Sequence, residues 1–308
     1  MPDTHPLPAP LEPDPHEHGL ASGDLDALST TIAQAWALFA DVAAAADLEA
    51  PSRKNGWSGR DIVAKVGEWE IGRRLDHMLA EAHDGDADFY DQDTLDEAIR
   101  AHAAGLPLDH TLAALDRHRE TTIDWLASDG PRTWGLVHTS SPLGPLPVLT
   151  VLNAMTYQLS IAALDLAPCG VEPPDELMRI GLTALMDTTG ALAGRRHITG
   201  SFVASTPDLI LGVGSRSGHW HTAFLDEDPM HGPAVIAPAR VVLDVTSGRA
   251  HVATMYRTGE LRVRDLTGML RLAPVLDGIP GIPPLGAVGR ALSAVDTAIG
   301  GLMGRFRR

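Results

Sequence analysis

One lysine occupies a position where its charge needs an explanation. In the stretch GWSGRDIVAKVGEWE, residues 56–70, Ile62, Val66 and Trp69 recur at helical spacing and share one face. Lys65 follows Ile62 by three residues and precedes Trp69 by four, so it lies at the edge of that face and points partly inward. Burying an ammonium group is costly unless the group is paired or loses its charge. The position predicts a lysine with an interior partner, one that faces a cavity, or one whose head reaches water.

Histidines and aspartates on the expected helices offer ligands for a metal ion. One histidine is expected on the second helix and two on the third. The latter two stand eight residues apart instead of four, so they do not form the pair that one turn of helix brings to a single ion. They are weak candidates for that reason. The residues concerned are His77, His110 and His118, with Asp76, Asp109 and Asp116 beside them.

Two further histidine pairs and one cysteine lie outside these helices. His219 and His221 share one face of an expected strand, which suits zinc, but no third ligand is evident beside them. His16 and His18 fall in a segment expected to be disordered, where two imidazoles seldom form a site. Cys169 is the single cysteine, so an internal disulfide is excluded and the thiol is interpreted as incidental.

Other catalytic signatures are missing from the sequence. It contains no G-x-S-x-G motif, no phosphate-binding loop and no dinucleotide fingerprint. The run GVGSRSG, residues 212–218, is interpreted as a turn between strands because no helix follows it. Paired carboxylates are abundant, but in so acidic a chain they are typical of a solvated surface.

Length and charge limit the function classes. The 308 residues predict two domains, and the net charge of −16 argues against nucleic acid as a partner. No run of eighteen apolar residues is present, so no membrane span is expected. The first residues lack a basic cluster and an apolar segment, which predicts a cytoplasmic protein without a secretory signal.

Helical periodicity organises the first half of the chain. Ser58 is expected to cap the second helix, with Asp61 as its capping partner three residues later. The third helical region is expected to break near Gly105 and Pro107, and a loop rich in glycine and proline precedes the fourth. The pattern predicts an antiparallel four-helix bundle with one long connection. Its helices are expected at residues 25–50, 58–82, 94–126 and 148–166.

The second half predicts a small α+β domain. A helix at residues 176–193 precedes three expected strands at 208–214, 219–225 and 239–246, followed by a helix at 247–257, a strand at 259–264 and a closing helix at 267–276. The expected organisation is a disordered Pro-rich arm (1–22), the bundle (23–170), the α+β domain (171–280) and a C-terminal helix (281–308).

Short motifs in both halves resemble the mycothiol-dependent maleylpyruvate isomerase family. They are Gly56, Trp57, Arg60 and Asp61 around the start of the second helix, Asp165 to Ala167 at the end of the fourth, and VVLDVTSGRAHVATMYRTGELRVRDLTGML in the second half. The resemblance covers about residues 25 to 280. It implies a DinB-like four-helix bundle followed by a sterol-carrier-like α+β domain.

The resemblance also implies a divalent metal and the thiol mycothiol as cofactors. The family holds the metal with one histidine on the second helix and an E-x-x-x-H pair on the fourth. Here the matching positions are Lys65, Gln158 and Ala162. A charged ammonium has no lone pair and alanine has no donor atom, so the resemblance implies that the metal site is lost and no cofactor is expected.

Lys65 and Gln158 then become candidates for binding. Gln158 follows Met155 by three residues and is expected to face the bundle interior. We expect the Lys65 ammonium to donate a hydrogen bond to the amide oxygen of Gln158. The predicted ligand-binding residues are Lys65, Gln158, Trp69 and Met155, and no metal ligand is predicted.

The C-terminal segment, residues 284–308, carries an apolar stripe at helical spacing and a local charge of about +3, from four arginines and one aspartate. Such a helix either covers an apolar groove, on its own chain or on a second copy as a homodimer, or lies on an anionic membrane as a peripheral contact.

Three functions remain open. The first is a non-catalytic member of the family that binds or carries a small apolar or lipid-like molecule. The second is a mycothiol-dependent isomerase or transferase acting on a small organic acid, with a relocated metal or with Lys65 as base or anchor. Arginines of the second half then offer contacts to an anionic substrate. The third is a structural or regulatory partner that assembles through residues 284–308. The arginines are Arg249, Arg257 and Arg262.

Overall fold

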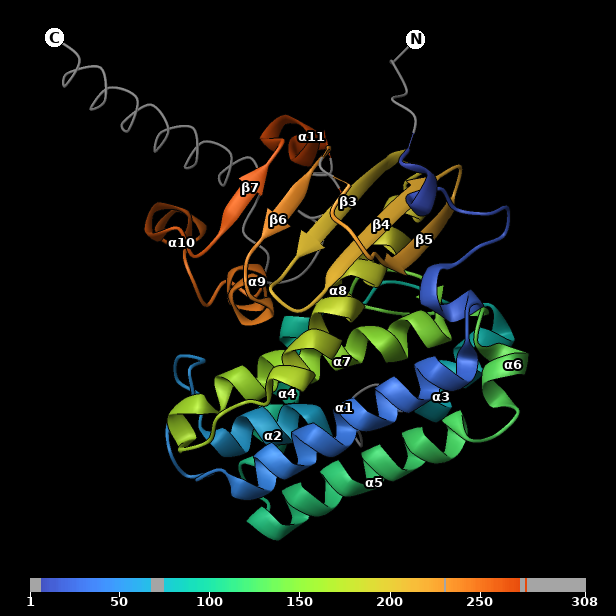
Figure 1. Cartoon of the computed structure of the whole chain (residues 1–308). Coiled ribbons are helices and arrows are strands. Elements are labelled where there is room, and N and C mark those ends of the chain that lie inside the picture. The colour runs from blue at the N-terminus through green and yellow to red at the C-terminus, as the bar shows by residue number, and fades with distance from the viewer. Residues whose placement is uncertain (1–6, 68–74, 230, 272–274, 276–308) are drawn as a thin grey trace, which may run out of the picture. The chain divides into compact units, whose positions relative to one another are not determined.

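A computed structural model describes residues 7–67, 75–229, 231–271 and 275 (Figure 1). The chain mixes helix and sheet and divides into two compact units. The helical unit comprises residues His18–Ala191, and the sheet unit comprises Met1–Glu17 with Leu192–Arg308. The chain therefore starts in the sheet unit, builds the helical unit, and returns.

Long helices make up most of the helical unit. Helix α1 contacts α5 and α7, and α2 contacts the same two helices, so these four segments enclose a common core. Trp36, Phe39 and Ile32 of α1 are completely buried there. The unit contains α1 (Leu25–Ala45), α2 (Gly59–Gly67), α3 (Leu75–Asp84), α4 (Gln92–Ala103), α5 (Leu108–Leu126), α6 (Gly130–Trp134), α7 (Val148–Asp165), most of α8 (Asp175–Arg195), the 3-10 helices Gly19–Ser22 and Ala167–Cys169, and the short strands β1 (His138–Thr139) and β2 (Leu146–Pro147).

Helix α1 is long and apolar enough to cross a membrane by length and composition alone. In this structure its apolar positions recur at helical spacing and are buried in the core of the helical unit, against α5 and α7. Core helices of globular proteins commonly have this composition.

The sheet unit is built on a five-stranded sheet with the order β5-β4-β3-β6-β7. Neighbouring strands are antiparallel except β3 and β6, which run parallel. Three short helices lie among the later strands (Figure 1). The elements are β3 (Gly200–Ser205), β4 (Ile210–Arg216), β5 (His219–Phe224), β6 (Ala234–Ile236), α9 (Ala239–Thr246), α10 (Val252–Thr258), β7 (Arg262–Arg264) and α11 (Leu266–Arg271).

One predicted strand in this unit is wrong. Residues 239–246 form helix α9, although the run is rich in valine. Pro238 precedes the helix, where its fixed φ favours helix initiation, and Val242 and Leu243 bury one side. Packing thus overrides the strand preference of branched side chains. Strands β3 and β6 were not predicted, because β3 is interrupted by small residues and β6 has three residues.

The predicted disorder of residues 1–22 is wrong for residues 7–22. This segment contains two 3-10 helices, Ala9–Leu11 and Gly19–Ser22, and Leu11 is completely buried. Its low content of large apolar residues led to the prediction, but Leu7 and Leu11 are both buried. The boundary expected at residue 170 also differs from the division after Ala191, because most of α8 belongs to the helical unit. The predicted C-terminal helix, residues 281–308, lies outside the described residues.

Candidate binding pocket in the helical unit

A local capping motif fixes the start of α2. The Ser58 hydroxyl accepts a hydrogen bond from the Asp61 backbone N–H at 3.2 Å, and the Asp61 carboxylate accepts one from the Ser58 backbone N–H at 2.8 Å. This reciprocal pair satisfies donors that a helix start leaves open. The prediction for Ser58 and Asp61 is therefore confirmed, and the start of the helix that carries Lys65 is fixed.

The turn before α2 positions a second lysine. The Nζ atom of Lys54 lies 3.4 Å from the centroid of the Trp57 ring, and the Arg100 guanidinium carbon lies 5.5 Å from the same centroid. Trp57 is buried, and its face attracts cations. The tryptophan of the GWSGRD motif therefore directs Lys54 toward the neighbourhood of Lys65.

Both lysines contact one buried carboxylate. The Nζ atom of Lys65 lies 2.7 Å from Oδ2 of Asp96, and the Nζ atom of Lys54 lies 3.4 Å from the same oxygen. The amide of Gln92, one turn earlier on α4, donates a hydrogen bond of 2.6 Å to Oδ1. Asp96 is 2% exposed, and these partners reach both of its carboxylate oxygens. Lys65 thus has an interior partner, supplied by α4.

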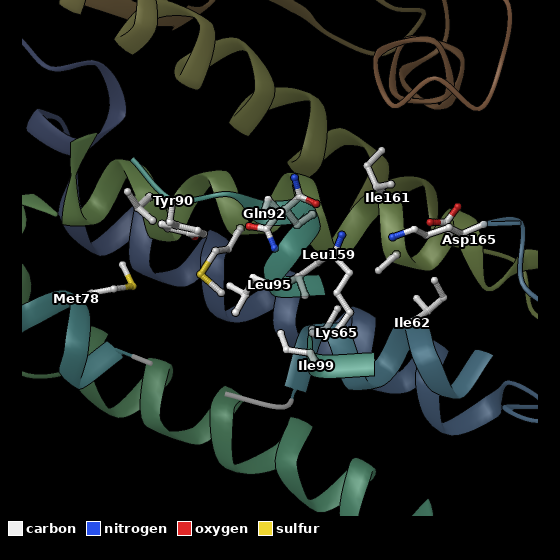
Figure 2. A pocket seen from close by; sticks show the side chains of 16 residues that line it. Ile62, Lys65, Met78, Tyr90, Gln92, Leu95, Ile99, Leu159, Ile161 and Asp165 are labelled. Carbon is white, nitrogen blue, oxygen red and sulfur yellow. The ribbon is translucent and has the colours of Figure 1, made fainter. Parts of the chain in front are cut away.

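A pocket with a volume of about 110 Å³ lies beside this cluster. Figure 2 shows Lys65 extending from α2 into the group of lining side chains, with Gln92 and Leu95 on one side of it and Asp165 on the other. Ten of the sixteen lining residues are apolar. They are Ile62, Val66, Met78, Leu95, Ile99, Val151, Met155, Leu159, Ile161 and Ala162, and the polar ones are Lys54, Lys65, Tyr90, Gln92, Gln158 and Asp165.

The structure brings three of the four predicted ligand-binding residues to this pocket. Lys65, Met155 and Gln158 all line it, and their role in binding stays a prediction. Trp69 lies outside the described residues. The predicted hydrogen bond from Lys65 to Gln158 is replaced by the ion pair with Asp96. Gln158 is exposed, so it lies at the rim of the pocket instead of deep in the bundle.

Sequence reasoning missed the carboxylate that pairs with Lys65. Asp96 is 31 positions after Lys65 in the sequence, within a strongly acidic stretch where one aspartate resembles its neighbours. Its spacing from Leu95 and Ile99, which are on the apolar side of α4, is a usable signal. Asp165 has a similar signal, because it continues the face of α7 that carries Gln158 and Ala162.

His118, a predicted candidate ligand, is buried between helices instead. Its Nδ1 lies 2.9 Å from the carbonyl oxygen of Val66, and its ring packs edge-on against Trp36 with centroids 4.4 Å apart. Burial lowers the pKa of His118 to about 3, and the Val66 carbonyl opposes this change. The imidazole is therefore neutral at pH 7 and donates from Nδ1. Gly67 permits this close approach, since a Cβ there would lie 2.6 Å from the Leu115 nitrogen.

The remaining candidate ligands do not meet. His77 and the predicted aspartates Asp76, Asp109 and Asp116 are exposed, and His110 is half-buried. Within the described part of the chain, no group of three histidine, cysteine, aspartate or glutamate side chains is arranged to hold a metal ion. His219 and His221 lie on β5 in the sheet unit, where His221 contacts Glu17.

The candidate anion-binding arginines and the cysteine occupy ordinary positions. Arg257 and Arg262 are exposed, and Arg249 donates a hydrogen bond of 2.8 Å to the Ser247 carbonyl. Cys169 is buried, and burial together with the negative charge of Asp47 raises the pKa of its thiol. A thiol with a raised pKa is a poor nucleophile at neutral pH.

Comparisons with known proteins give similarity in structure alone. No protein-family model matches the chain, and no curated protein matches it. Two similar solved chains are crystal structures of mycothiol-dependent maleylpyruvate isomerase, one of them a mutant form. Each has 15% sequence identity with this chain, a TM-score of 0.48, and a match that covers 84% of this chain and 96% of the other.

Proposed function

We propose that the helical unit binds a small, largely apolar molecule without catalysing a reaction. The observation that carries this proposal is the pocket itself, with its apolar lining and its lysines paired to the carboxylate of Asp96. Pockets of this composition bind ligands through apolar contact and use a few polar groups for orientation. Tyr90, Gln92 and Gln158 are the uncharged polar groups available for that purpose.

Size and charge define the ligand further. A volume of about 110 Å³ is below the roughly 300 Å³ at which drug-sized pockets begin, so a small molecule fits better than a whole lipid. The four charged groups in or beside the pocket balance, with Lys54 and Lys65 against Asp96 and Asp165. A neutral ligand or one with a single polar group suits this balance.

The donor set does not fit the divalent metal that the family resemblance implies. At the three matching positions, Lys65 is engaged by Asp96, Ala162 has no donor atom, and Gln158 is exposed at the rim. A charged ammonium offers no lone pair, and one amide oxygen is a weak site for a transition metal. No step of the proposed function therefore uses a metal at these positions.

The alternative is an enzyme of the mycothiol-dependent type in which Lys65 acts as base or anchor. Its support is the resemblance in the GWSGRD motif and in the second half of the chain. Its obstacle is that the Lys65 nitrogen already contacts Asp96, so a substrate must first break that contact. We place the chain as a degenerate relative of the isomerase family, with a DinB-like bundle and a sterol-carrier-like second half.

The location of the protein is part of the same proposal. We propose a cytoplasmic protein that contacts membranes or a second copy through residues 284–308, whose apolar stripe and arginines support either contact. Removal of residues 284–308 tests this directly. Loss of vesicle binding identifies a membrane contact, loss of dimers identifies self-association, and loss of neither contradicts the proposal.

Binding is tested by filling the pocket. Ala162→Leu adds a branched side chain to the pocket wall, and Ala101→Leu adds the same group at an exposed site on α4. A panel of small apolar compounds is screened against the wild-type chain by thermal shift. We expect compounds that bind the wild-type chain to bind Ala162→Leu at least about tenfold more weakly and to bind Ala101→Leu with unchanged affinity. Equal affinity for both variants, or no hit, contradicts the proposal.

A further inference from the structure

The N-terminal arm, residues 7–17, lies on one face of the sheet in its own unit. Its 3-10 helix contacts strands β4 and β5, and Figure 1 shows the blue segment beside one end of these strands. Leu11 is completely buried and forms a cluster with Val203 and Ala234, against which Ile210, Ala223 and Leu225 pack. Leu11 is therefore the most deeply buried apolar side chain of the arm.

Two glycines of β4 make room for Leu11. A Cβ atom at Gly212 would lie 2.4 Å from Cδ2 of Leu11, and a Cβ at Gly214 would lie 1.7 Å from the Leu11 carbonyl oxygen. Residues two apart in a strand share a face, so both glycines lie under the arm. Any other residue at Gly214 would exclude the arm from its present position. The two glycines therefore let the backbone and side chain of Leu11 lie directly against the strand.

An arginine and a histidine beside these glycines pair with carboxylates of the arm. The Arg216 guanidinium donates to the Glu12 carboxylate, and Nδ1 of His221 contacts the Glu17 carboxylate. The backbone N–H of Trp220 donates a hydrogen bond of 3.3 Å to the carbonyl oxygen of Glu17. The arm therefore contacts the sheet through residues that include Leu11, Glu12 and Glu17.

The arm has the composition of a ligand for this face. LPAPLEPDPHE contains three acidic residues and no lysine or arginine, whereas the sheet presents Arg216, His219 and His221 beneath it. This local complementarity stands out in a chain of net charge −16. Its four prolines restrict the unbound arm, which lowers the entropy lost on binding.

We propose that this face is a peptide-binding groove, formed by Val203, Gly212, Gly214, Arg216 and His221, and that the arm is its resident, displaceable ligand. The groove takes an acidic, proline-containing segment of another protein in which a leucine is followed directly by one acid and, six residues after the leucine, by a second. These are the positions of Leu11, Glu12 and Glu17 in the arm. Such a partner competes with the tethered arm.

The test uses a fluorescent synthetic peptide of residues 7–17 and the full chain. The tethered arm acts at a high effective concentration, so the wild-type chain is expected to bind the peptide weakly. Leu11→Asp in the chain removes the buried leucine side chain and is expected to raise peptide affinity by at least about tenfold in fluorescence anisotropy. A folded Leu11→Asp chain that binds no better than the wild type overturns the proposal.

A charge exchange identifies the groove. Peptide carrying Glu12→Arg is expected to lose binding to the Leu11→Asp chain and to regain it when the chain also carries Arg216→Glu. Unchanged binding of the altered peptide overturns the assignment. If Leu11→Asp fails to fold, a second experiment on the wild-type chain tests the proposal. Excess unlabelled peptide is expected to displace the arm and so to accelerate amide hydrogen exchange in it. Exchange that is unaffected by millimolar peptide overturns the proposal.

Discussion

Two buried ionisable residues of the helical unit, Asp96 and His118, differ in the groups that surround them. Asp96 contacts two lysines and a glutamine amide. His118 lies against the Val66 carbonyl oxygen and the Trp36 ring, and burial lowers its pKa to about 3. Opposite charges beside a buried group favour its charged form, whereas burial by itself disfavours that form. Asp96 lies beside the pocket, and His118 lies where α2 and α5 pack closely.

The largest expected effect comes from removing the charge that pairs with both lysines. Asp96→Ala leaves Lys54 and Lys65 facing each other without a carboxylate, and we expect a loss of about 3 kcal/mol in the free energy of unfolding. Urea denaturation measures it. Glu97→Ala, next in sequence but exposed and paired only on the surface with Arg100, is the matched control and should change stability by less than about 0.5 kcal/mol. Similar losses in both variants would refute the role assigned to Asp96.

Removing one of the two lysines should cost less. Lys65→Met keeps the apolar stem, and Lys54 remains within 3.4 Å of the carboxylate. We expect a loss of about 2 kcal/mol in denaturation, because the closer of two partners is gone. If Lys65→Met is as stable as the wild type, the ion pair contributes nothing and Lys65 is held only by packing.

The effect of burial on His118 is tested by measuring how the free energy of unfolding depends on pH. The pKa of His118 is about 3 in the folded chain and about 6.5 when unfolded, so between these values only the unfolded chain takes up the proton. The contribution of His118 to the free energy of unfolding is therefore fully present above pH 6.5. It falls by up to about 1.4 kcal/mol per pH unit as the pH drops toward 3. His118→Leu should flatten this part of the stability profile. An unchanged slope would show that other groups cause it.

The smallest expected effect concerns the helix start that positions Lys65. Ser58→Ala removes the side-chain oxygen that accepts from Asp61 and should cost about 1 kcal/mol. Ser58→Asn, another capping residue, should restore most of it. The comparison of the two melting curves separates a capping role from a loss of general packing, since in the latter case asparagine would not rescue.

The features that could be predicted from the sequence are those formed by residues close together in the chain. The cap of Ser58 and Asp61 spans three residues, and the helical stripe of α7 is a local repeat, so both could be read from spacing. The break between α4 and α5 at Gly105 and Pro107 was predicted for the same reason.

Distant pairings were not predictable in this way. Nothing local distinguishes Asp96 from the surrounding aspartates, and its pairing with Lys65 appears only when α4 packs beside α2. Composition predicts disorder for the arm because it says nothing of Gly212 and Gly214, some 200 residues away, which accommodate Leu11. Helix α9 shows the converse, a local strand preference that packing overrides.

The central claim is that the pocket beside Lys65 binds a small molecule and holds no metal. Metal analysis of the purified chain, combined with native mass spectrometry of wild type and Ala162→Leu, tests both parts in one preparation. The account predicts less than about 0.1 equivalent of zinc, manganese, iron or nickel, and a small-molecule adduct on the wild type that Ala162→Leu loses. One equivalent of tightly bound metal that Lys65→Met or Ala162→Leu releases would contradict it.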